Sequence, residues 1–258
     1  MSEALYTACA AGMDEKLFFA DLLPSDEIRL VVDYGAGRRP VSIAARAEGF
    51  ATQAKVVLVD NRAGVLSEFD TGDWAEQDVV IDMAGIPHWA REDARKTCSL
   101  LVASSVLHEQ RHAGAVADDL FSLGFTYVVV RDFCRVSGKA PAKQAGDDHS
   151  WGRVLGAVTN EGTRGHLARM APENDYELVE AALKARWARG TDTDRELDED
   201  YFSLASSDLS LAVEKHGYYP LHLAYRTPPA VRQILADLAI RATVPTHVEA
   251  VYYKPTKR

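Results

Sequence analysis

The chain has 258 residues, of which 47% are hydrophobic and 26% are charged, and this composition excludes disordered, collagen-like and fibrous proteins. Its 38 acidic side chains outnumber its 29 basic ones, which gives a formal net charge of −9. That sign excludes a protein that grips a nucleic-acid backbone over most of its surface, although a local basic groove stays compatible with it.

Short β-branched runs bounded by turn residues alternate with helix-like periodicity through the first half of the chain. Five runs predict strands, at residues 28–33, 55–60, 78–82, 99–104 and 126–132. The intervals between them predict helices at residues 41–50, 89–97 and 112–123. Such alternation is the mark of a parallel sheet built from βαβ units. The strands are almost continuously apolar, which indicates that helices cover both faces.

The segment from about residue 134 to 215 interrupts this alternation. It opens with a polar stretch rich in Gly and Lys and continues with helical periodicity but without a convincing strand. After it, residues 216–225 and 246–253 predict two final strands around a helix at residues 229–240. The segment therefore reads as an insertion, and its length of roughly 80 residues is too great for a plain connection.

Together these elements predict an α/β protein with a doubly wound, Rossmann-like sheet. We expect seven strands, mostly parallel, with an antiparallel last strand and helices on both faces. We expect a single domain over residues 1–258, with a core of about 25–133 and 216–258. The largely helical insertion over about 134–215 would then lie between the fifth and sixth strands, on the substrate side.

The carboxyl ends of the predicted strands carry the residues of interest, because ligands of open α/β sheets bind there. The residues at four of these ends are Asp33-Tyr34-Gly35-Ala36-Gly37, Asp60-Asn61, Asp82-Met83 and Ser104-Ser105-Val106-Leu107-His108-Glu109. Gly35 and Gly37 permit a tight turn and close approach to a ligand. A dinucleotide fingerprint needs a third glycine where Pro40 stands, which disfavours a pyrophosphate site.

Carboxylates stand in or beside four of the five strand ends. They suit a ligand with a ribose diol and positive charge, and Asp60 in particular is placed to accept both ribose hydroxyls. Each piece also has a simpler interpretation, since the glycines could end a strand and Asp60 or Asp82 could cap a helix. Four such pieces in this order favour a binding site.

The order of these motifs resembles the class I S-adenosylmethionine-dependent methyltransferases, over about residues 25–133 and 216–253 but not the insertion. The resemblance implies a Rossmann-like fold, S-adenosylmethionine as cofactor and methyl transfer. By position, it assigns Asp33 and Gly35 to the methionine amino group, Gly37 to close approach, and Asp60 to the ribose. It assigns Asp82 and Met83 to the adenine. Tyr34, Ala36, Asn61 and Ser104 complete the expected cofactor contacts.

One departure from the family pattern concerns the loop after Gly37. Arg38 stands where the family has its usual third glycine. The loop therefore differs in shape, or Arg38 meets the cofactor carboxylate.

A base for methyl transfer would come from the end of the fourth strand. His108 and Ser104 are the predicted catalytic residues there, and His108 titrates close to neutrality. A histidine at a helix start also commonly packs or caps, and Glu109 fits a first-turn charge. Arg131 and Asp132, which close the fifth strand, can orient an acceptor or form an ion pair that fixes the following loop.

The acceptor is not identified by any motif. Nucleic-acid amino methyltransferases of the familiar kind carry (D/N/S)PP(Y/F) at the fourth strand, whereas this chain has Ser-Ser-Val-Leu. We expect the insertion to bind a small-molecule or nucleic-acid acceptor, the latter through basic and aromatic residues that would equally decorate a solvated helix pair. These residues are Lys139, Lys143, His149, Trp151, Arg153, Arg164, Arg169, Arg186, Trp187 and Arg189.

Two other functions stay open at this point. One is a non-catalytic cofactor-binding subunit with a regulatory or scaffold role. The other is an NAD(P)-dependent oxidoreductase, which the missing third glycine and the absence of a Tyr-x-x-x-Lys pair disfavour.

The cysteines and apolar runs bear on location. Cys9, Cys98 and Cys134 lie far apart and form no C-x-x-C pair, so we expect neither a disulfide framework nor a metal site. No apolar run approaches the roughly 20 residues that a membrane span needs, and the N-terminus lacks the pattern of a secretion signal. We therefore expect a cytoplasmic protein with no membrane partner.

Overall fold

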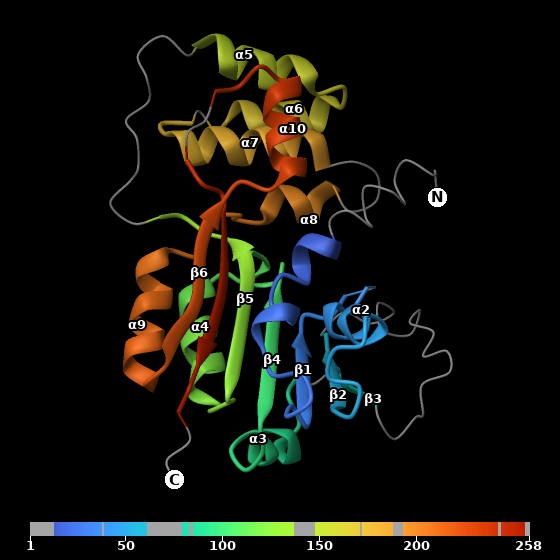
Figure 1. Cartoon of the computed structure of the whole chain (residues 1–258). Helices are drawn as coiled ribbons and strands as arrows, with labels where there is room; N and C mark the ends of the chain where they lie inside the picture. Colours follow the sequence, from blue (N-terminus) through green and yellow to red (C-terminus); the bar gives the residue numbers. More distant parts are fainter. Residues whose placement is uncertain are drawn as a thin grey trace.

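The computed structural model describes residues 13–37, 39–60, 79–82, 85–136, 148–170, 172–187, 193–241 and 244–255. Within these residues the strands form a seven-stranded sheet in the order β3-β2-β1-β4-β5-β7-β6 (Figure 1). The strands are β1 (Leu30–Tyr34), β2 (Lys55–Val59), β3 (Val79–Asp82), β4 (Ser99–Ser104), β5 (Tyr127–Phe133), β6 (Tyr219–Arg226) and β7 (His247–Tyr253).

The sheet is mixed. Strands β1 to β5 pair in parallel, whereas β7 pairs antiparallel with both β5 and β6. The order reverses between β1 and β4, so the carboxyl ends of these two strands form the switch point at which such sheets bind ligands. The predicted α/β class with a Rossmann-like mixed sheet is confirmed.

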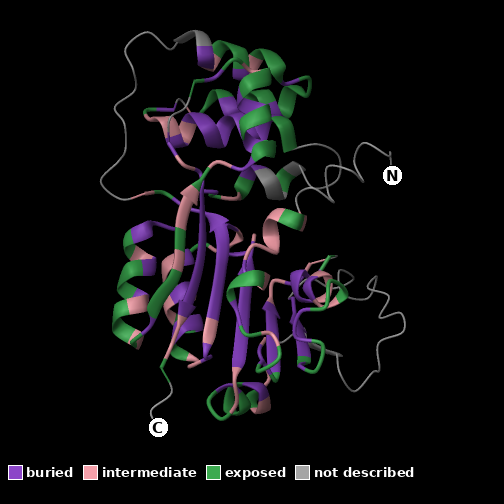
Figure 2. Ribbon diagram, in the orientation of Figure 1, coloured by how far each residue is buried: buried purple, intermediate pink, exposed green. Residues whose placement is uncertain are grey.

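Helices cover both faces of the sheet (Figure 2). On one face, α3 (His88–Ala94), α4 (Ala113–Ser122) and α9 (Ser206–His216) share a buried core with β1, β4 and β5. On the other face, η1 (Ala20–Leu22), α2 (Val41–Ala47) and the chain around them bury a second cluster, which includes Phe19 and Phe50. Burial on both faces explains why the strand sequences are almost wholly apolar.

The remaining helices form a separate helical lobe beyond the carboxyl ends of the strands (Figure 1). They are α5 (Asp148–Ala157), α6 (Glu161–Ala168), α7 (Asp175–Trp187), α8 (Thr193–Asp198) and α10 (Pro229–Asp237). These helices pack around α7, and Phe133 at the end of β5 joins their core to the sheet. None of the described helices, including the 13-residue α7, is long and apolar enough to cross a bilayer.

Two helices pack in a different part of the protein from the part to which the sequence analysis assigns them. Helix α9, which we expected within the insertion over residues 134–215, packs on α4 and belongs to the layer that covers the sheet. Helix α10, which we expected in the core over residues 216–258, packs on α7 in the helical lobe. Both helices are amphipathic, and their sequences do not reveal which partner each apolar face meets.

Candidate functional site

The loop after β1 folds over the end of β2. The backbone N–H groups of Gly35 and Ala36 both donate to the carbonyl oxygen of Val59, at 2.8 and 3.0 Å. The N–H of Gly37 donates to Oδ2 of Asp60 at 2.9 Å. The structure therefore brings together the Gly35–Gly37 loop and the buried Asp60, as the strand-end argument predicts.

Gly35 is required by its surroundings. Its φ of +71° lies in the left-handed region, and a Cβ at this position would lie 2.1 Å from Cγ2 of Val106. Val106 follows β4, so the segment after β4 packs directly against the glycine loop. Ser105, one residue earlier, has a φ of +59°, which is uncommon for a residue with a side chain.

Asp33, in β1 before this loop, is almost completely buried. Its Oδ2 accepts hydrogen bonds from the backbone N–H and the hydroxyl of Ser42, both at 2.8 Å. Burial raises the pKa of Asp33, and the two bonds from Ser42 oppose that rise. Asp33 therefore ties β1 to the start of α2. Tyr34, next in sequence, packs against the core on the opposite face of the sheet.

Of the other residues predicted to contact the cofactor, the structure describes Ser104 in full and only the backbone of Asp82. Asp82 ends β3, beside Val59 of β2, and its side chain lies outside the described residues, as do Asn61, Met83 and Arg38. Ser104 ends β4, and its hydroxyl is buried with no hydrogen-bond partner among the described residues. A ligand group at the switch point would satisfy that hydroxyl.

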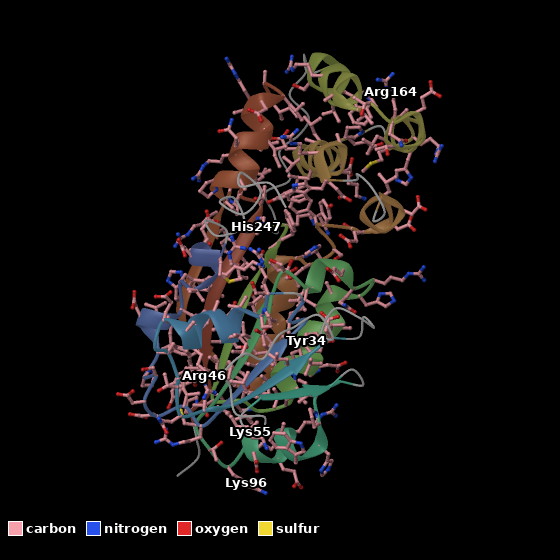
Figure 3. All side chains as sticks on the ribbon, turned by 90° about the vertical axis from the view of Figure 1, so that its right-hand side faces the viewer. Tyr34, Arg46, Lys55, Lys96, Arg164 and His247 are labelled. Carbon is pink, nitrogen blue, oxygen red and sulfur yellow. The ribbon has the colours of Figure 1, made fainter. Side chains whose placement is uncertain are left out.

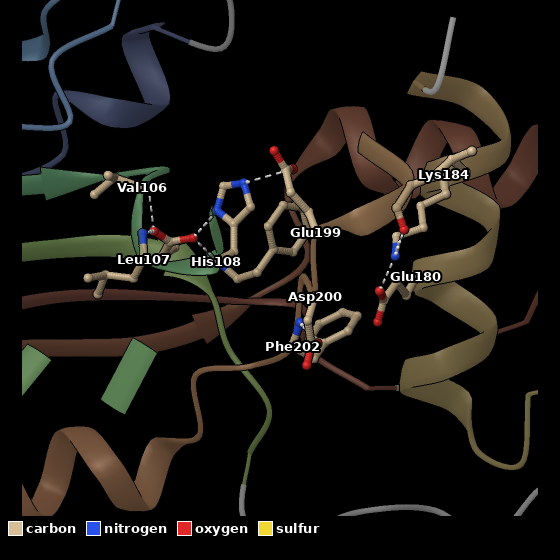
Figure 4. A network of polar contacts seen from close by, with 11 residues as sticks. Val106, Leu107, His108, Glu180, Lys184, Glu199, Asp200 and Phe202 are labelled. Atoms are coloured by element: carbon tan, nitrogen blue, oxygen red, sulfur yellow. Dashed lines mark hydrogen bonds and ion pairs between the residues drawn. The ribbon is translucent and has the colours of Figure 1, made fainter. Parts of the chain in front are cut away.

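His108 and Asp132 form a buried pair at the ends of β4 and β5. Nδ1 of His108 lies 2.6 Å from Oδ1 of Asp132. The carboxylate of Asp132 also accepts the backbone N–H groups of Val106, Leu107 and Phe133, at 2.7, 2.6 and 2.7 Å. These bonds fix both groups, so the imidazole is oriented with Nε2 directed away from Asp132 (Figure 4).

Nε2 of His108 lies 3.9 Å from Oε2 of Glu199, a residue between α8 and α9. Burial lowers the pKa of His108, but the carboxylates of Asp132 and Glu199 outweigh this effect, so that the net pKa is raised. For Asp132, burial alone would raise the pKa. The charge of His108 and the hydrogen bonds from His108 and the backbone N–H groups outweigh burial, so that the pKa of Asp132 is lowered. The pair thus favours an imidazolium beside a carboxylate.

His108 opens onto a cavity of about 340 Å³ between the sheet and the helical lobe. Aromatic and imidazole rings form part of the wall, and the charged lining residues are of both signs rather than mainly basic. The lining includes Glu15, Lys16, His108, Glu109, Arg131, Phe133, Trp187, Glu199, Tyr201 and His247. Within the described part of the chain, no group of three His, Cys, Asp or Glu side chains could hold a metal ion.

His247 lies at the junction of lobe and sheet (Figure 3). Its ring centroid is 4.1 Å from that of Phe133, and burial, with a smaller effect of Arg131, lowers its pKa to about 3. Arg131 is itself engaged, since Nη2 donates to Glu15 at 3.0 Å. Arg131 therefore holds the N-terminal segment over the cavity and does not act as an isolated charge.

Sequence reasoning missed Glu199, Tyr201 and His247. Glu199 stands in an acidic run that resembles a solvated surface, and the two ring residues stand in or near elements that predict core packing. No local pattern distinguishes them. A signal did exist for the Asp132–His108 pair, because β4 and β5 are neighbours and their carboxyl ends must meet.

Two members of the predicted basic surface of the insertion, Arg153 and Arg164, are engaged within the lobe, whereas Lys139, Lys143 and Arg189 and the side chain of His149 lie outside the described residues. Nε and Nη2 of Arg153 donate to the carbonyl oxygens of Leu238 and Ala239, both at 2.8 Å. Nη2 of Arg164 donates to the carbonyl of Val158. Trp187 lines the cavity. These contacts tie the helices of the lobe together.

Comparison with protein-family models and with curated proteins gives no match to this sequence. Solved structures do match. A geranyl diphosphate methyltransferase in complex with GPP and sinefungin aligns over 94% of this chain and 78% of that one, with a TM-score of 0.52 and 11% identity. A putative S-adenosylmethionine-dependent methyltransferase from Listeria monocytogenes aligns over 95% and 97%, with a TM-score of 0.51 and 14% identity.

A further match is CalO1, a methyltransferase in calicheamicin biosynthesis, in its SAH-bound form. This chain spans 57% of its length, at 15% identity and a TM-score of 0.47. The structural similarity of this chain to the geranyl diphosphate methyltransferase and to the Listeria monocytogenes protein shows its fold, which is the fold of the class I S-adenosylmethionine-dependent methyltransferases.

Proposed function

We propose that this protein is an S-adenosylmethionine-dependent methyltransferase whose acceptor binds in the cavity beside His108. The observation that carries the proposal is the position of Val106. Its side chain packs on Gly35 of the glycine loop, and its N–H donates to Asp132, the partner of His108. One segment thus connects the expected cofactor loop to an oriented imidazole on a cavity, as methyl transfer between two adjacent ligands requires.

The residues at the switch point fit the cofactor. Asp60 is a buried carboxylate at the end of β2, where a ribose diol would bind, and it already orders the glycine loop through Gly37. The buried hydroxyl of Ser104, which has no partner among the described residues, offers a hydrogen-bonding group beside β1. When bound, the cofactor would supply a methyl group activated by a sulfonium.

The chain's own residues would then manage the acceptor and its proton. Asp132 fixes His108 with Nε2 facing the cavity. The raised pKa of His108 makes its neutral form a stronger base, and that form, whose fraction increases with pH, accepts a proton from the acceptor. Asp132 and Glu199 stabilise the imidazolium that forms. Trp187 of the helical lobe lines the cavity on one side.

The cavity favours a small-molecule acceptor over a nucleic acid. Its charged lining combines Glu15, Glu109 and Glu199 with Lys16 and Arg131, which is not the basic groove that a phosphate backbone needs. In the lobe, Arg153 and Arg164 hydrogen-bond to backbone carbonyls. Both observations support a compact acceptor enclosed in about 340 Å³.

The proposal is tested by incubating the protein with tritium-methyl S-adenosylmethionine and a fractionated cell extract. We expect label in the small-metabolite fraction. His108→Gln should lower kcat by about 10²- to 10⁴-fold, the usual contribution of a general base, without weakening binding of S-adenosylhomocysteine. Lys215→Met, which removes an ion pair between α9 and Asp118 of α4, should change neither quantity.

Two results would contradict this function. Label in RNA, DNA or protein would place the acceptor outside the cavity. Tight cofactor binding without transfer to any fraction would favour a non-catalytic cofactor-binding protein.

A further inference from the structure

One part of the cavity wall consists of ring side chains, namely Phe133, Trp187, Tyr201 and His247. Phe133 lies at their centre, with ring centroids 4.9 Å from Tyr201 at an interplanar angle of 11°, and 6.0 Å from Trp187. His247 contacts the same ring, and all four line the cavity. Phe133, Tyr201 and His247 are buried against one another, whereas Trp187 is 37% exposed, so that Trp187 offers the ring surface on which a planar group can pack.

The polar end of the cavity is built around His108. Nδ1 is occupied by Asp132, whereas the 3.9 Å separation of Nε2 from Glu199 exceeds hydrogen-bond length. Nε2 therefore makes an ion-pair contact but no hydrogen bond within the described residues. An acceptor group that reaches Nε2 would complete its hydrogen bonding.

A buried ion pair in α7 fixes the position of Glu199. Nζ of Lys184 lies 2.8 Å from Oε1 of Glu180 and donates to the carbonyl of Leu197 at 3.0 Å. The backbone N–H of Tyr201 bonds to the carboxylate of Glu180. The pair thus hydrogen-bonds to the backbone at Leu197 and Tyr201, two residues before and two residues after Glu199. We call Glu180 and Lys184 the α7 clamp.

Burial makes the clamp costly unless it is fully paired. Lys184 is 4% exposed and Glu180 is 8% exposed. Two charges in such a site stabilise a fold only with good geometry and additional hydrogen bonds, and an apolar pair would often serve as well. The charged pair also hydrogen-bonds to the backbone on both sides of Glu199, which an apolar pair could not do.

A hydroxyl acceptor needs a general base such as His108 more than an amine acceptor does. A neutral amine attacks through its lone pair and loses its proton afterwards, whereas a hydroxyl is a weak nucleophile until a base takes its proton. An imidazole fixed by a buried carboxylate is the arrangement that supplies such a base.

We propose that the acceptor is a small planar molecule with a hydroxyl group, bound against the ring wall with the hydroxyl on Nε2 of His108, and that the α7 clamp positions Glu199 to stabilise the protonated imidazole. This rests on the proposed function. The acceptor hydroxyl gives its proton to Nε2 while its oxygen bonds to the methyl carbon. The carbon–sulfur bond breaks, and the sulfonium becomes a neutral thioether, so that the positive charge passes to His108.

Other charged groups also face His108 and enter its titration. Asp132 and Arg131 approach from β5, Glu109 from its own 3-10 turn, η2 (Leu107–Glu109), and His247 from β7, while Glu15 and Lys16 approach from the N-terminal segment. Glu109→Gln therefore serves as the matched control. It removes a negative charge near His108 without removing the one that the clamp holds.

The role of Glu199 is tested by NMR titration of histidine-labelled full-length protein without cofactor. We expect Glu199→Gln to move the His108 titration to lower pH, and Lys184→Met to move it in the same direction. Lys184→Arg should restore it, and Glu109→Gln should have the smaller effect because Glu109 contributes less. An unchanged titration in folded Glu199→Gln would overturn the role of Glu199. If Lys184→Met does not fold, Glu180→Gln tests the clamp in the same way.

The acceptor class is tested with p-cresol and toluene, which differ by one hydroxyl. We expect p-cresol to shift the His108 imidazole resonances and to bind at least about tenfold more tightly, the scale of one hydrogen bond. Equal affinity for toluene would overturn the hydroxyl contact, and no binding of either probe would overturn the planar acceptor. Both experiments omit the cofactor, so their outcome is independent of whether S-adenosylmethionine binds.

Discussion

Substitution of Gly35 by alanine tests the contact on which the proposed connection between the two ligand sites depends. The new Cβ would lie 2.1 Å from Cγ2 and 2.5 Å from Cβ of Val106, distances at which atoms must move. The left-handed backbone adds about 1–2 kcal/mol of strain, and overpacking of a buried side chain adds about 1–3 kcal/mol. We therefore expect Gly35→Ala to lower the free energy of unfolding by about 2–5 kcal/mol.

A matched control separates these two contributions. Gly217, at the end of α9, has the same φ of +71°, and a Cβ added there would meet no described heavy atom within 4 Å, so Gly217→Ala carries the backbone strain alone. Urea unfolding with an unchanged m value measures both variants. Adding Val106→Gly to Gly35→Ala should recover much of the difference, whereas Val106→Ala should not, because its Cβ still overlaps. If Gly35→Ala costs no more than Gly217→Ala, the packing of Val106 on the loop is not as described.

Three further predictions concern the carboxylates and His247. Asp60→Ala should weaken S-adenosylhomocysteine binding by about 1–3 kcal/mol in calorimetry, the scale of a hydrogen bond to a charged group, and an unchanged affinity would mean that Asp60 is misassigned. Asp132→Asn should cost about 3–5 kcal/mol in urea unfolding, because it leaves backbone donors and His108 without their buried carboxylate, and a loss below about 1 kcal/mol would show that the pair is not buried as described. Because the pKa of His247 falls from about 6.5 unfolded to about 3 folded, its contribution to stability is complete above about pH 6.5 and declines by about 1.4 kcal/mol per unit as the pH falls toward 3. His247→Phe should reduce this acid sensitivity in urea unfolding at successive pH values, and an identical pH profile would contradict the buried neutral imidazole.

Much of the sheet follows from local sequence. Runs such as Val56-Val57-Leu58-Val59 are apolar on both sides, and a strand buried under two helical layers is the structure that accepts them. The order of strands then follows from connection rules, and it places Gly35 beside Asp60 without further information. These parts could be predicted because each depends on neighbours in the chain or on adjacent strands.

The partners of the helices and the far wall of the cavity could not be predicted. α9 and α10 are both amphipathic, and only the folded arrangement directs one to α4 and the other to α7. Glu199 meets His108 from 91 positions later in the chain, through a clamp whose charges resemble an ordinary solvated helix face in the sequence. Contacts between such distant segments leave no periodic signal in either one.

The central claim is that the carboxyl ends of β1 and β2 hold an adenosyl sulfonium rather than a dinucleotide. Calorimetric titration of the full chain with S-adenosylhomocysteine and, separately, with NAD tests it directly. We predict that S-adenosylhomocysteine binds and that NAD does not. Tighter binding of NAD, or binding of neither compound by folded protein, would contradict the claim.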